Sequence, residues 1–337
     1  MSLPSSYQKL VAIHPETGNL REACTVQDVE MTMPLPGDIL VKTHYTGVNA
    51  ADYLMALGRY LSNTEPPFDL GAESVGEVVA VGDGVEGIKV GDAVLSLMDG
   101  GFTDYFTTKA RHAIPVPQAT PDVVQLGVSG LTASIALEEV GDMTSGETVL
   151  VTAAAGGTGS MTVQLAKIAG NTVIGTCGND DKVAYLESIG CDRPINYRTE
   201  DVKQVLKEEY PNGVDIVFES VGAEMFDLAV KALAVHGRLI VIGAISEYEQ
   251  GPQAVTRPRI GYSLMTRSAS IRAFWLMNFF KQTVPHLQKL LGLVQSGQLK
   301  LSADDGVFKG ASGALDALEH MYAGNNIGKV VVDFTDE

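Results

Sequence analysis

The feature that most constrains this chain is a stretch in which an apolar, β-branched segment enters a turn of small residues and leaves it as a helical pattern. Residues 149–161 read VLVTAAAGGTGSM. The apolar positions of the helical pattern that follows are Val163, Leu165, Ala166 and Ile168. A strand, a glycine-rich turn and a helix in this order form the phosphate-binding turn of dinucleotide-binding domains.

Three residues of this turn match the fingerprint G-x-G-x-x-G, with alanine in place of the first glycine: Ala154, Gly156 and Gly159. The tight turn tolerates the methyl group of Ala154, whereas Gly156 has to let the backbone approach a pyrophosphate. Gly159 allows the helix to pack closely on its strand, and the free N–H groups at the helix N-terminus hold the phosphates. We therefore expect a bound dinucleotide.

Length and charge narrow the class of protein. At 337 residues the chain is about two domains long. Its formal net charge of −17 argues against nucleic acid or an anionic membrane surface as the main partner. We find no secretory signal and no apolar run of about 18 residues that would span a membrane. A cytoplasmic location is the default expectation, and a peroxisomal or mitochondrial one stays open.

The distribution of strand and helix patterns predicts an α/β protein with two domains. Expected strands of the first part cover residues 10–13, 38–45, 71–82 and 91–97, the third range being a pair of strands interrupted by glycines. Later strands at 172–176, 214–219 and 237–243 alternate with helices at 129–137, 181–189 and 225–233. The tail has helical patterns at 284–294 and 311–321 and a strand at 329–334. We expect a β-rich barrel domain over 1–125, completed by 275–337, and a doubly wound parallel sheet over 126–274.

Three local motifs carry a resemblance to a known family. They are GVNAAD at 47–52 before Gly58-Arg59-Tyr60, Gly71-Ala72-Glu73 before a glycine-containing strand, and the fingerprint at 154–159. Over nearly the whole chain, the sequence resembles the zinc-independent quinone-oxidoreductase branch of the medium-chain dehydrogenase/reductase superfamily. The resemblance implies a GroES-like domain, a Rossmann domain and a homodimer formed by sheet-edge strands, to which Ile240–Ala244 or a neighbouring strand could contribute.

The residues at the metal positions of the zinc dehydrogenases predict that this chain holds no metal. Asn49 stands in the region where those enzymes have a thiolate ligand, and residues 95–112 contain no cysteine for a structural zinc. His44 and His112 remain, without a thiolate beside them. The three cysteines, at 24, 177 and 191, are too scattered for a disulfide framework.

The end of the second strand of the dinucleotide-binding domain favours NADPH over NADH. NAD-binding domains place a carboxylate there for the adenosine ribose, but this chain has Cys177 and Gly178. Asp180 and Asp181 follow closely, so the choice is not settled by this position alone. Lys182 could pair with a 2′-phosphate. The resemblance assigns both Lys182 and Tyr197 to that phosphate.

The resemblance also implies further cofactor contacts along the chain. With the residues above, the expected cofactor-binding set is Thr132, Gly156, Gly157, Thr158, Gly159, Gly178, Lys182, Tyr197, Ser220, Ile242, Tyr248, Phe274, Trp275, Leu276 and Asn326. For Ile242, Phe274 and Leu276, simple packing in the core is the alternative.

Hydride transfer without a metal suits two classes of substrate. One is an α,β-unsaturated ketone such as a 15-keto-prostaglandin-like enone, and the other is a quinone. In both, the negative charge that develops on oxygen needs only a hydrogen-bond donor. By resemblance, Tyr60 is the expected catalytic donor, the alternative being that it only lines the apolar pocket. Asn49 is expected to position the nicotinamide or substrate or only to cap the strand-end turn, and Tyr262 is a weaker candidate donor. Two alternatives stay open. One is an enoyl-CoA reductase, which needs a basic rim such as Arg257, Arg259, Arg267 and Arg272. The other is a non-catalytic, crystallin-like NADPH-binding protein.

Overall fold

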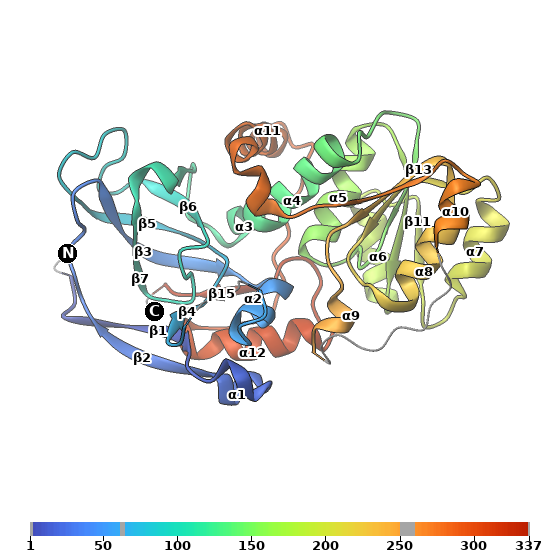
Figure 1. Cartoon of the computed structure of the whole chain (residues 1–337). Coiled ribbons are helices and arrows are strands. Elements are labelled where there is room, and N and C mark those ends of the chain that lie inside the picture. The colour runs from blue at the N-terminus through green and yellow to red at the C-terminus, as the bar shows by residue number, and fades with distance from the viewer. Residues whose placement is uncertain (1–2, 61–64, 250–259, 336–337) are drawn as a thin grey trace. The chain divides into compact units, whose positions relative to one another are not determined.

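The computed structural model describes residues 3–60, 65–249 and 260–335, and the chain divides into two compact units (Figure 1). Unit 1 comprises Met1–Val128 and Leu301–Glu337, and unit 2 comprises Ser129–Lys300. The second unit therefore extends beyond residue 274, the boundary expected from the sequence. Each unit is described by itself below.

Unit 2 is built on a six-stranded parallel sheet with helices on its faces (Figure 1). Its strands are β9 (Thr148–Val151), β10 (Thr172–Cys177), β11 (Arg193–Asn196), β12 (Val214–Glu219), β13 (Leu233–Val241) and β14 (Ser270–Ala273), in the order β11-β10-β9-β12-β13-β14. The main crossover helices are α5 (Gly157–Ile168), α6 (Asp180–Ser188), α7 (Val202–Glu209) and α8 (Ala223–Ala232). This order reverses direction at β9, as in a doubly wound dinucleotide-binding fold, and confirms the predicted parallel sheet.

The outer strand on one side of this sheet is β14, not β13. Each residue of β14 pairs in parallel with β13, from Arg238 opposite Ser270 to Val241 opposite Ala273. Residues 240–241 are therefore inside the sheet, and the neighbouring strand β14 presents the edge. The sequence missed β14 because it is four residues long and carries polar Ser270 and Arg272.

Helix α11 (Thr283–Gln295), which follows β14 in the chain, belongs to unit 2 and packs against α4 (Leu131–Ile135). The Ser134 hydroxyl and the Nδ1 atom of buried His286 lie 2.7 Å apart. Burial lowers the pKa of His286 and so favours its neutral form. An ion pair between Lys289 and Glu138 joins α11 to η4 (Ala136–Val140). Other short helices of this unit are α9 (Ile245–Tyr248), α10 (Gly261–Met265) and η5 (Leu276–Gln282).

Unit 1 contains two β-sheets and four α-helices among its described residues. One sheet has the order β2-β1-β4, from β1 (Ser6–Ala12), β2 (Cys24–Glu30) and β4 (Phe68–Asp69). The other runs β15-β3-β5-β6-β8, with β7 beside β3, from β3 (Asp38–Gly47), β5 (Glu73–Val81), β6 (Ala93–Leu97), β7 (Tyr105–Lys109), β8 (Ile114–Pro115) and β15 (Val331–Asp333). The helices are α1 (Leu20–Ala23), α2 (Ala50–Ala56), α3 (Pro121–Val124) and α12 (Gly310–Tyr322). Unit 1 is therefore rich in β-structure and includes the C-terminal segment Leu301–Glu337.

The glycine-containing segment 71–82 forms one strand, β5, rather than the expected pair. Gly76 does not break the strand but lets it approach β3, because a Cβ there would lie 2.2 Å from the Lys42 carbonyl oxygen. The register between β3 and β5 shifts twice, which accounts for the irregular sequence pattern.

One helical stretch, Pro121–Val140, is long and apolar enough by length and composition to cross a membrane, which corrects the expectation that no such run exists. Of its most apolar window, 78% is buried inside the protein, as in the core helix of a globular domain. It includes α3, α4 and two π-helical turns, η3 (Leu126–Gly130) and η4.

Candidate functional site

The fingerprint turn lies at the carboxyl end of β9 and leads directly into α5. Gly156 is the N-cap residue of α5, with extended φ and ψ of −82° and 177°. The Ala154 N–H donates to the Thr176 carbonyl at 3.0 Å, which holds the turn against β10. The first N–H groups of a helix lack partners within the helix, so this end of α5 can bind an anion.

The two glycines of the turn are required for different reasons. A Cβ on Gly159 would lie 2.3 Å from the Ala153 carbonyl oxygen and 2.7 Å from Ala154 Cα, so close packing of the helix on its strand demands glycine. A Cβ on Gly156 would meet only the Ala153 carbonyl oxygen, at an ordinary 3.5 Å. The chain's own atoms therefore do not need glycine at 156. A bare backbone at this point fits a ligand that approaches from outside the chain, as a pyrophosphate does.

A strained residue precedes the turn. Ala153 has a backbone φ of +49°, in the left-handed region that residues other than glycine rarely adopt, and it is exposed. Strain of this kind concentrates at ligand-binding loops, where the surrounding structure enforces it.

Ser220 directly follows β12, the strand that pairs with β9, and β9 leads into the fingerprint turn. The Thr152 hydroxyl accepts a hydrogen bond from the Ser220 N–H at 2.8 Å and so joins the ends of β9 and β12. The fully buried Glu219 carboxylate accepts from the Val221 and Gly222 N–H groups at 2.8 and 2.9 Å. Burial raises the pKa of Glu219. This is the point at which the strand order reverses, where open α/β sheets bind their ligands.

The ends of β10 and β11 bring Gly178 and Tyr197 together. Cys177 and Asn196 are paired across the two strands, and the Tyr197 N–H donates to the Cys177 carbonyl at 3.0 Å. A Cβ on Gly178 would lie 2.6 Å from Tyr197 Oη, so glycine makes room for the tyrosine ring. Tyr197 is 50% exposed, and Lys182 lies in the first turn of α6. Lys182 and Tyr197, the residues predicted to bind the 2′-phosphate, thus follow the carboxyl ends of the neighbouring strands β10 and β11.

The remaining expected cofactor residues of unit 2 are distributed over several elements. Thr132 is buried in α4, and the Thr158 hydroxyl donates to Ser129 Oγ at 3.4 Å. Ile242 directly follows β13, and its N–H donates to the Glu219 carbonyl. Tyr248 Oη accepts from the Ala244 N–H at 3.0 Å, and burial raises the pKa of the Tyr248 phenol.

The aromatic segment after β14 divides into a buried and an exposed residue. Phe274 is 7% exposed and its ring stacks on Phe279 with centroids 5.0 Å apart, which supports the core-packing alternative for Phe274. Trp275 is 42% exposed, and Leu276 is half-buried at the start of η5.

Asn49, the first residue of the expected catalytic pair, belongs to a buried ionic cluster of unit 1. Its Nδ2 donates to Glu73 Oε1 at 3.0 Å and to the Gly47 carbonyl at 3.1 Å, and its Oδ1 accepts from Lys329 Nζ at 2.7 Å. Lys329 Nζ also lies 2.5 Å from Glu73 Oε1, with side chains 2% and 0% exposed. Both amide protons of Asn49 are therefore used within the chain, which supports the alternative that Asn49 caps the strand-end turn.

Asp52 completes this cluster at the first turn of α2. One carboxylate oxygen accepts from the Asn49 N–H at 2.7 Å and the other from the Ala72 N–H at 2.9 Å. Burial raises the pKa of Asp52 to about 7. The cluster thereby fixes the turn between β3 and α2 to the start of β5.

Tyr60 follows α2 and is half-buried. Tyr322 contacts helix α2: its hydroxyl donates to the Ala50 carbonyl at 3.0 Å, and the centroid of its ring lies 4.6 Å from that of Tyr53. Asn326 is buried, and its Nδ2 donates to the Gly328 carbonyl, so it supports the loop that leads to Lys329.

The histidines weighed as metal ligands lie apart from a ligand set. His44 is in β3, while His112 is exposed in η2 (Ala110–His112) and accepts a hydrogen bond from Arg111 at 3.4 Å. Within residues 3–60, 65–249 and 260–335, no group of three His, Cys, Asp or Glu side chains is placed to hold a metal ion. All three cysteines are buried thiols.

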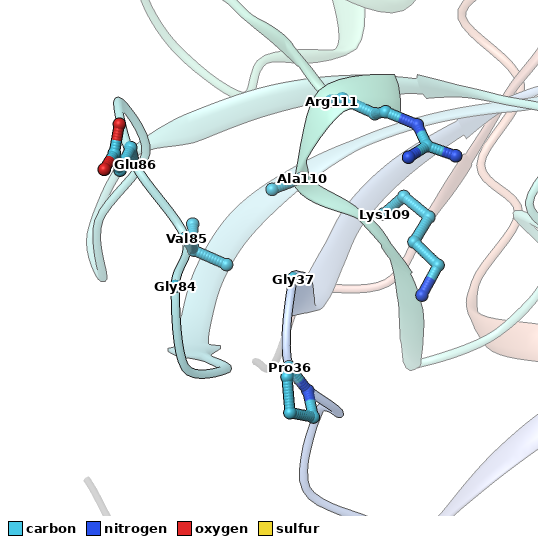
Figure 2. Close-up of a pocket in the computed structure, with 8 residues that line it drawn as sticks. All are labelled: Pro36, Gly37, Gly84, Val85, Glu86, Lys109, Ala110 and Arg111. Carbon is cyan, nitrogen blue, oxygen red and sulfur yellow. The ribbon is translucent and has the colours of Figure 1, made fainter.

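A hollow of about 370 Å³ in unit 1 lies on the surface around Lys109 and Arg111 (Figure 2). None of the expected site residues lines it. Lys109 Nζ is paired with Asp38 at 2.6 Å, so one of its two cations is already bound to a carboxylate. This hollow is not the candidate site.

The basic segment considered for coenzyme A is only partly visible. Arg257 and Arg259 lie outside the described residues. Arg272 donates to the Val140 carbonyl at 2.6 Å and pairs with Asp142, and Arg267 donates to the Ser263 carbonyl at 3.4 Å. Tyr262, the weaker donor candidate, is 73% exposed in α10. The two described arginines therefore serve contacts within unit 2.

Sequence reasoning missed the buried polar groups that hold the site residues in place. Lys329 was placed at the start of a strand, Asp52 was only part of a motif, and Asn196 was only the residue before Tyr197. A lysine or aspartate in an otherwise apolar setting is a usable signal, because such groups are rarely buried without a partner. The identity of the partner is not readable from the sequence.

Two family models match the chain. One, described as an alcohol dehydrogenase GroES-like domain, matches residues 35–118, and the other, described as a zinc-binding dehydrogenase, matches residues 157–292. The word zinc in the second description refers to the family model. In this chain Asn49, which stands in the region of the metal-binding thiolate of zinc dehydrogenases, accepts a hydrogen bond from Lys329.

Curated relatives match over nearly the full length. Prostaglandin reductase-3 of Mus musculus is 47% identical over 98% of this chain and 90% of the relative. A probable quinone oxidoreductase of Leishmania amazonensis is 42% identical over 99% of both chains. Among solved structures, a mycobacterial protein complexed with NADPH matches with a TM-score of 0.82 and 29% identity over 98% of this chain and 100% of the other.

Proposed function

Because this chain belongs to the medium-chain dehydrogenase/reductase superfamily, in its quinone-oxidoreductase branch, we propose that it is an NADPH-dependent reductase of α,β-unsaturated ketones or quinones. The observation that carries the proposal is Gly156. It leaves the backbone bare at the N-terminus of α5 and at the reversal point of the parallel sheet, although no atom of the chain requires glycine there. The relatives named for prostaglandin reduction and quinone oxidoreduction support the two substrate classes.

The residues of unit 2 fit a phosphorylated dinucleotide. The turn at Gly156–Gly159 and the N-terminus of α5 would hold the pyrophosphate, and Ser220 lies at the neighbouring strand end. Cys177 in place of a strand-end carboxylate, with Lys182 and Tyr197 beside it, suits the 2′-phosphate of NADPH. The NADPH in the mycobacterial relative's structure supports this choice. The remaining proposed contacts are Thr132, Gly157, Thr158, Ile242, Tyr248, Trp275, Leu276 and Asn326. Phe274 is proposed to pack in the core against Phe279.

When bound, NADPH supplies the hydride, and the protein supplies orientation and stabilisation of charge. Tyr60 would donate a hydrogen bond to the carbonyl oxygen of the substrate, on which negative charge develops as an enolate forms. Asn49 acts as a positioning residue, because its amide joins the Gly47 carbonyl, Glu73 and Lys329 at the turn that leads into α2. The ionic cluster thereby makes this turn rigid, and the chain runs from the turn through α2 to Tyr60.

The assay that tests the function is NADPH oxidation with a panel of a quinone, a 15-keto enone and an enoyl-CoA. The proposal expects turnover of the first two at rates above that of the thioester. Turnover of enoyl-CoA alone would establish the thioester reductase instead. Tight NADPH binding without turnover of any of the three would establish a non-catalytic binding protein.

Replacing Tyr60 by Phe tests the donor role. Turnover should fall about tenfold to a hundredfold with unchanged affinity for NADPH, since one donor to a developing oxyanion contributes about this much. Tyr262→Phe is the matched control, because Tyr262 is largely exposed and should leave the rate unchanged. A Tyr60→Phe rate within twofold of wild type would remove Tyr60 from the mechanism.

The proposed assembly is a homodimer in which the edge strand β14 pairs with its copy. In this arrangement the open edge of a buried parallel sheet is covered. The proposed location is cytoplasmic, with a small enone or quinone rather than nucleic acid or a membrane as the partner. Size-exclusion chromatography with light scattering checks the dimer, and a Pro substitution at Ile271 in β14 should shift it towards monomer.

A further inference from the structure

The acidic residue nearest to the end of β10 is held by an amide from the neighbouring strand. Asp180 is the first residue of α6, and its Oδ1 accepts a hydrogen bond from Asn196 Nδ2 at 2.8 Å. Asn196 is the last residue of β11 and is 5% exposed, whereas Asp180 is exposed. The position of the Asp180 carboxylate is therefore set by a buried group that cannot itself move freely.

The same asparagine organises the turn that carries Tyr197. Its Oδ1 accepts from the Arg198 N–H at 3.1 Å, and its carbonyl accepts from the Thr199 and Glu200 N–H groups. Across the sheet Asn196 is paired with Cys177, the strand-end residue at which NAD-binding domains place their ribose carboxylate. One buried residue thus connects three parts of the chain: its side chain joins the first turn of α6 to the turn at Tyr197, and its backbone pairs with the end of β10.

Asp180 is the group that could reverse the cofactor preference. It follows Cys177 by three residues, and a carboxylate free to turn towards the adenosine ribose would accept its hydroxyls and repel a 2′-phosphate. The hydrogen bond to Asn196 directs one carboxylate oxygen to the end of β11 instead. Asp181, the next residue, is also exposed but has no such connection to Asn196.

We propose that Asn196 is a specificity-determining positioning residue, which favours the 2′-phosphorylated dinucleotide by holding the Asp180 carboxylate at the end of β11. The inference rests on the proposed use of NADPH. It assigns the preference to a side chain that need not touch the cofactor, and it gives the two neighbouring acids different roles.

The test measures dissociation constants of NADPH and NADH by isothermal titration calorimetry at one ionic strength. Asn196→Ser is the main variant, because a serine hydroxyl still accepts from the Arg198 N–H in a turn but is too short to reach Asp180. Asn196→Ala is the second variant, and thermal melting confirms that each is folded. Asp180→Asn and the matched control Asp181→Asn are made in the wild-type and in the Asn196→Ser backgrounds.

The preference for NADPH over NADH should fall about five- to tenfold in Asn196→Ser, as expected for one partly solvated charge released near a phosphate. Asp180→Asn should restore it in that background while changing the wild-type preference by less than about threefold. Asp181→Asn should have the same small effect in both backgrounds, since its carboxylate is not held by Asn196.

Two results would overturn the inference while leaving NADPH binding intact. One is an unchanged preference in both Asn196 variants. The other is an effect of Asp180→Asn that is equal in the two backgrounds, which would mean that Asn196 acts only through the fold of the turn. A wild-type protein that binds NADH as tightly as NADPH would instead refute the proposed cofactor, and this inference with it.

Discussion

Lys329→Met should be among the most destabilising single substitutions in unit 1. The ammonium is 2% exposed and contacts Glu73 Oε1 at 2.5 Å and Asn49 Oδ1 at 2.7 Å. Removing it leaves the fully buried Glu73 carboxylate with the Asn49 amide and the Val128 N–H as its donors within the described part of the chain. Breaking a buried ion pair by removing one partner costs about 3–5 kcal/mol, because an uncompensated charge remains out of water.

The cost should come from the unpaired charge rather than from the lost lysine itself. Glu73→Gln alone leaves the ammonium without its carboxylate and should cost a similar amount. Removing both charges in Lys329→Met/Glu73→Gln should cost less than the sum of the single variants by at least about 1 kcal/mol. Lys9→Met is the matched control: its partner Asp69 is 51% exposed, so the loss should stay below about 1 kcal/mol.

Urea unfolding followed by circular dichroism gives the free energies of unfolding of these four variants and the wild type. A Lys329→Met loss no larger than that of Lys9→Met would refute the assignment of a stabilising buried ion pair. Strictly additive single and double variants would show that the two groups do not depend on each other.

Three further predictions follow from local geometry. Gly156→Ala should keep thermal stability near wild type and weaken NADPH binding about tenfold or more. Gly159→Ala should instead destabilise the fold, because its Cβ would lie 2.3 Å from a carbonyl oxygen. Calorimetry measures NADPH binding and thermal melting measures stability, so the two effects are separated. Ala153→Gly should raise the free energy of unfolding by up to about 1 kcal/mol in urea, because φ is +49°. Burial raises the pKa of Asp52 to about 7, from 3.8, so its neutral form stabilises the fold at low pH and this contribution is lost as pH rises through 7. The destabilisation caused by Asp52→Asn should therefore be smaller at pH 8 than at pH 5, by about 3 kcal/mol for the two pH units between 5 and the raised pKa, as measured by urea unfolding at both values.

The parts of the fold that were predicted correctly from sequence are those with a strong local pattern. Strand β12 was expected at its observed bounds, and α6 and α8 within two residues, since continuous apolar runs alternate there with helical spacing. β11 and β14 were missed because four-residue edge strands with Pro194 or Ser270 lack that pattern. The segment 71–82 was divided because a glycine required for close strand approach looks the same in sequence as one that breaks a strand.

The candidate site shows the same limit. The fingerprint turn is local, so its role for Gly159 could be argued from spacing and is supported by the packing against Ala153. Asn49 was associated with a strand-end turn, and its partners come from β5 and from the C-terminal segment. No sequence pattern relates Lys329 to Asn49, because their contact exists only once the tail has returned to the first sheet.

The buried cluster also bears on which reaction this fold can favour. Asn49 lies in the region where zinc dehydrogenases have a metal-binding thiolate, yet here its amide oxygen accepts from an ammonium and its two protons are donated to Glu73 and Gly47. These donors and acceptors are already satisfied, and a buried lysine beside them repels a divalent cation. Such a cluster favours stabilisation of negative charge by hydrogen-bond donors. A conjugated acceptor meets that condition better than an isolated carbonyl, because its charge is spread over an enolate before the proton arrives. The same residues that fix the turn before Tyr60 therefore favour reduction of a conjugated double bond or a quinone.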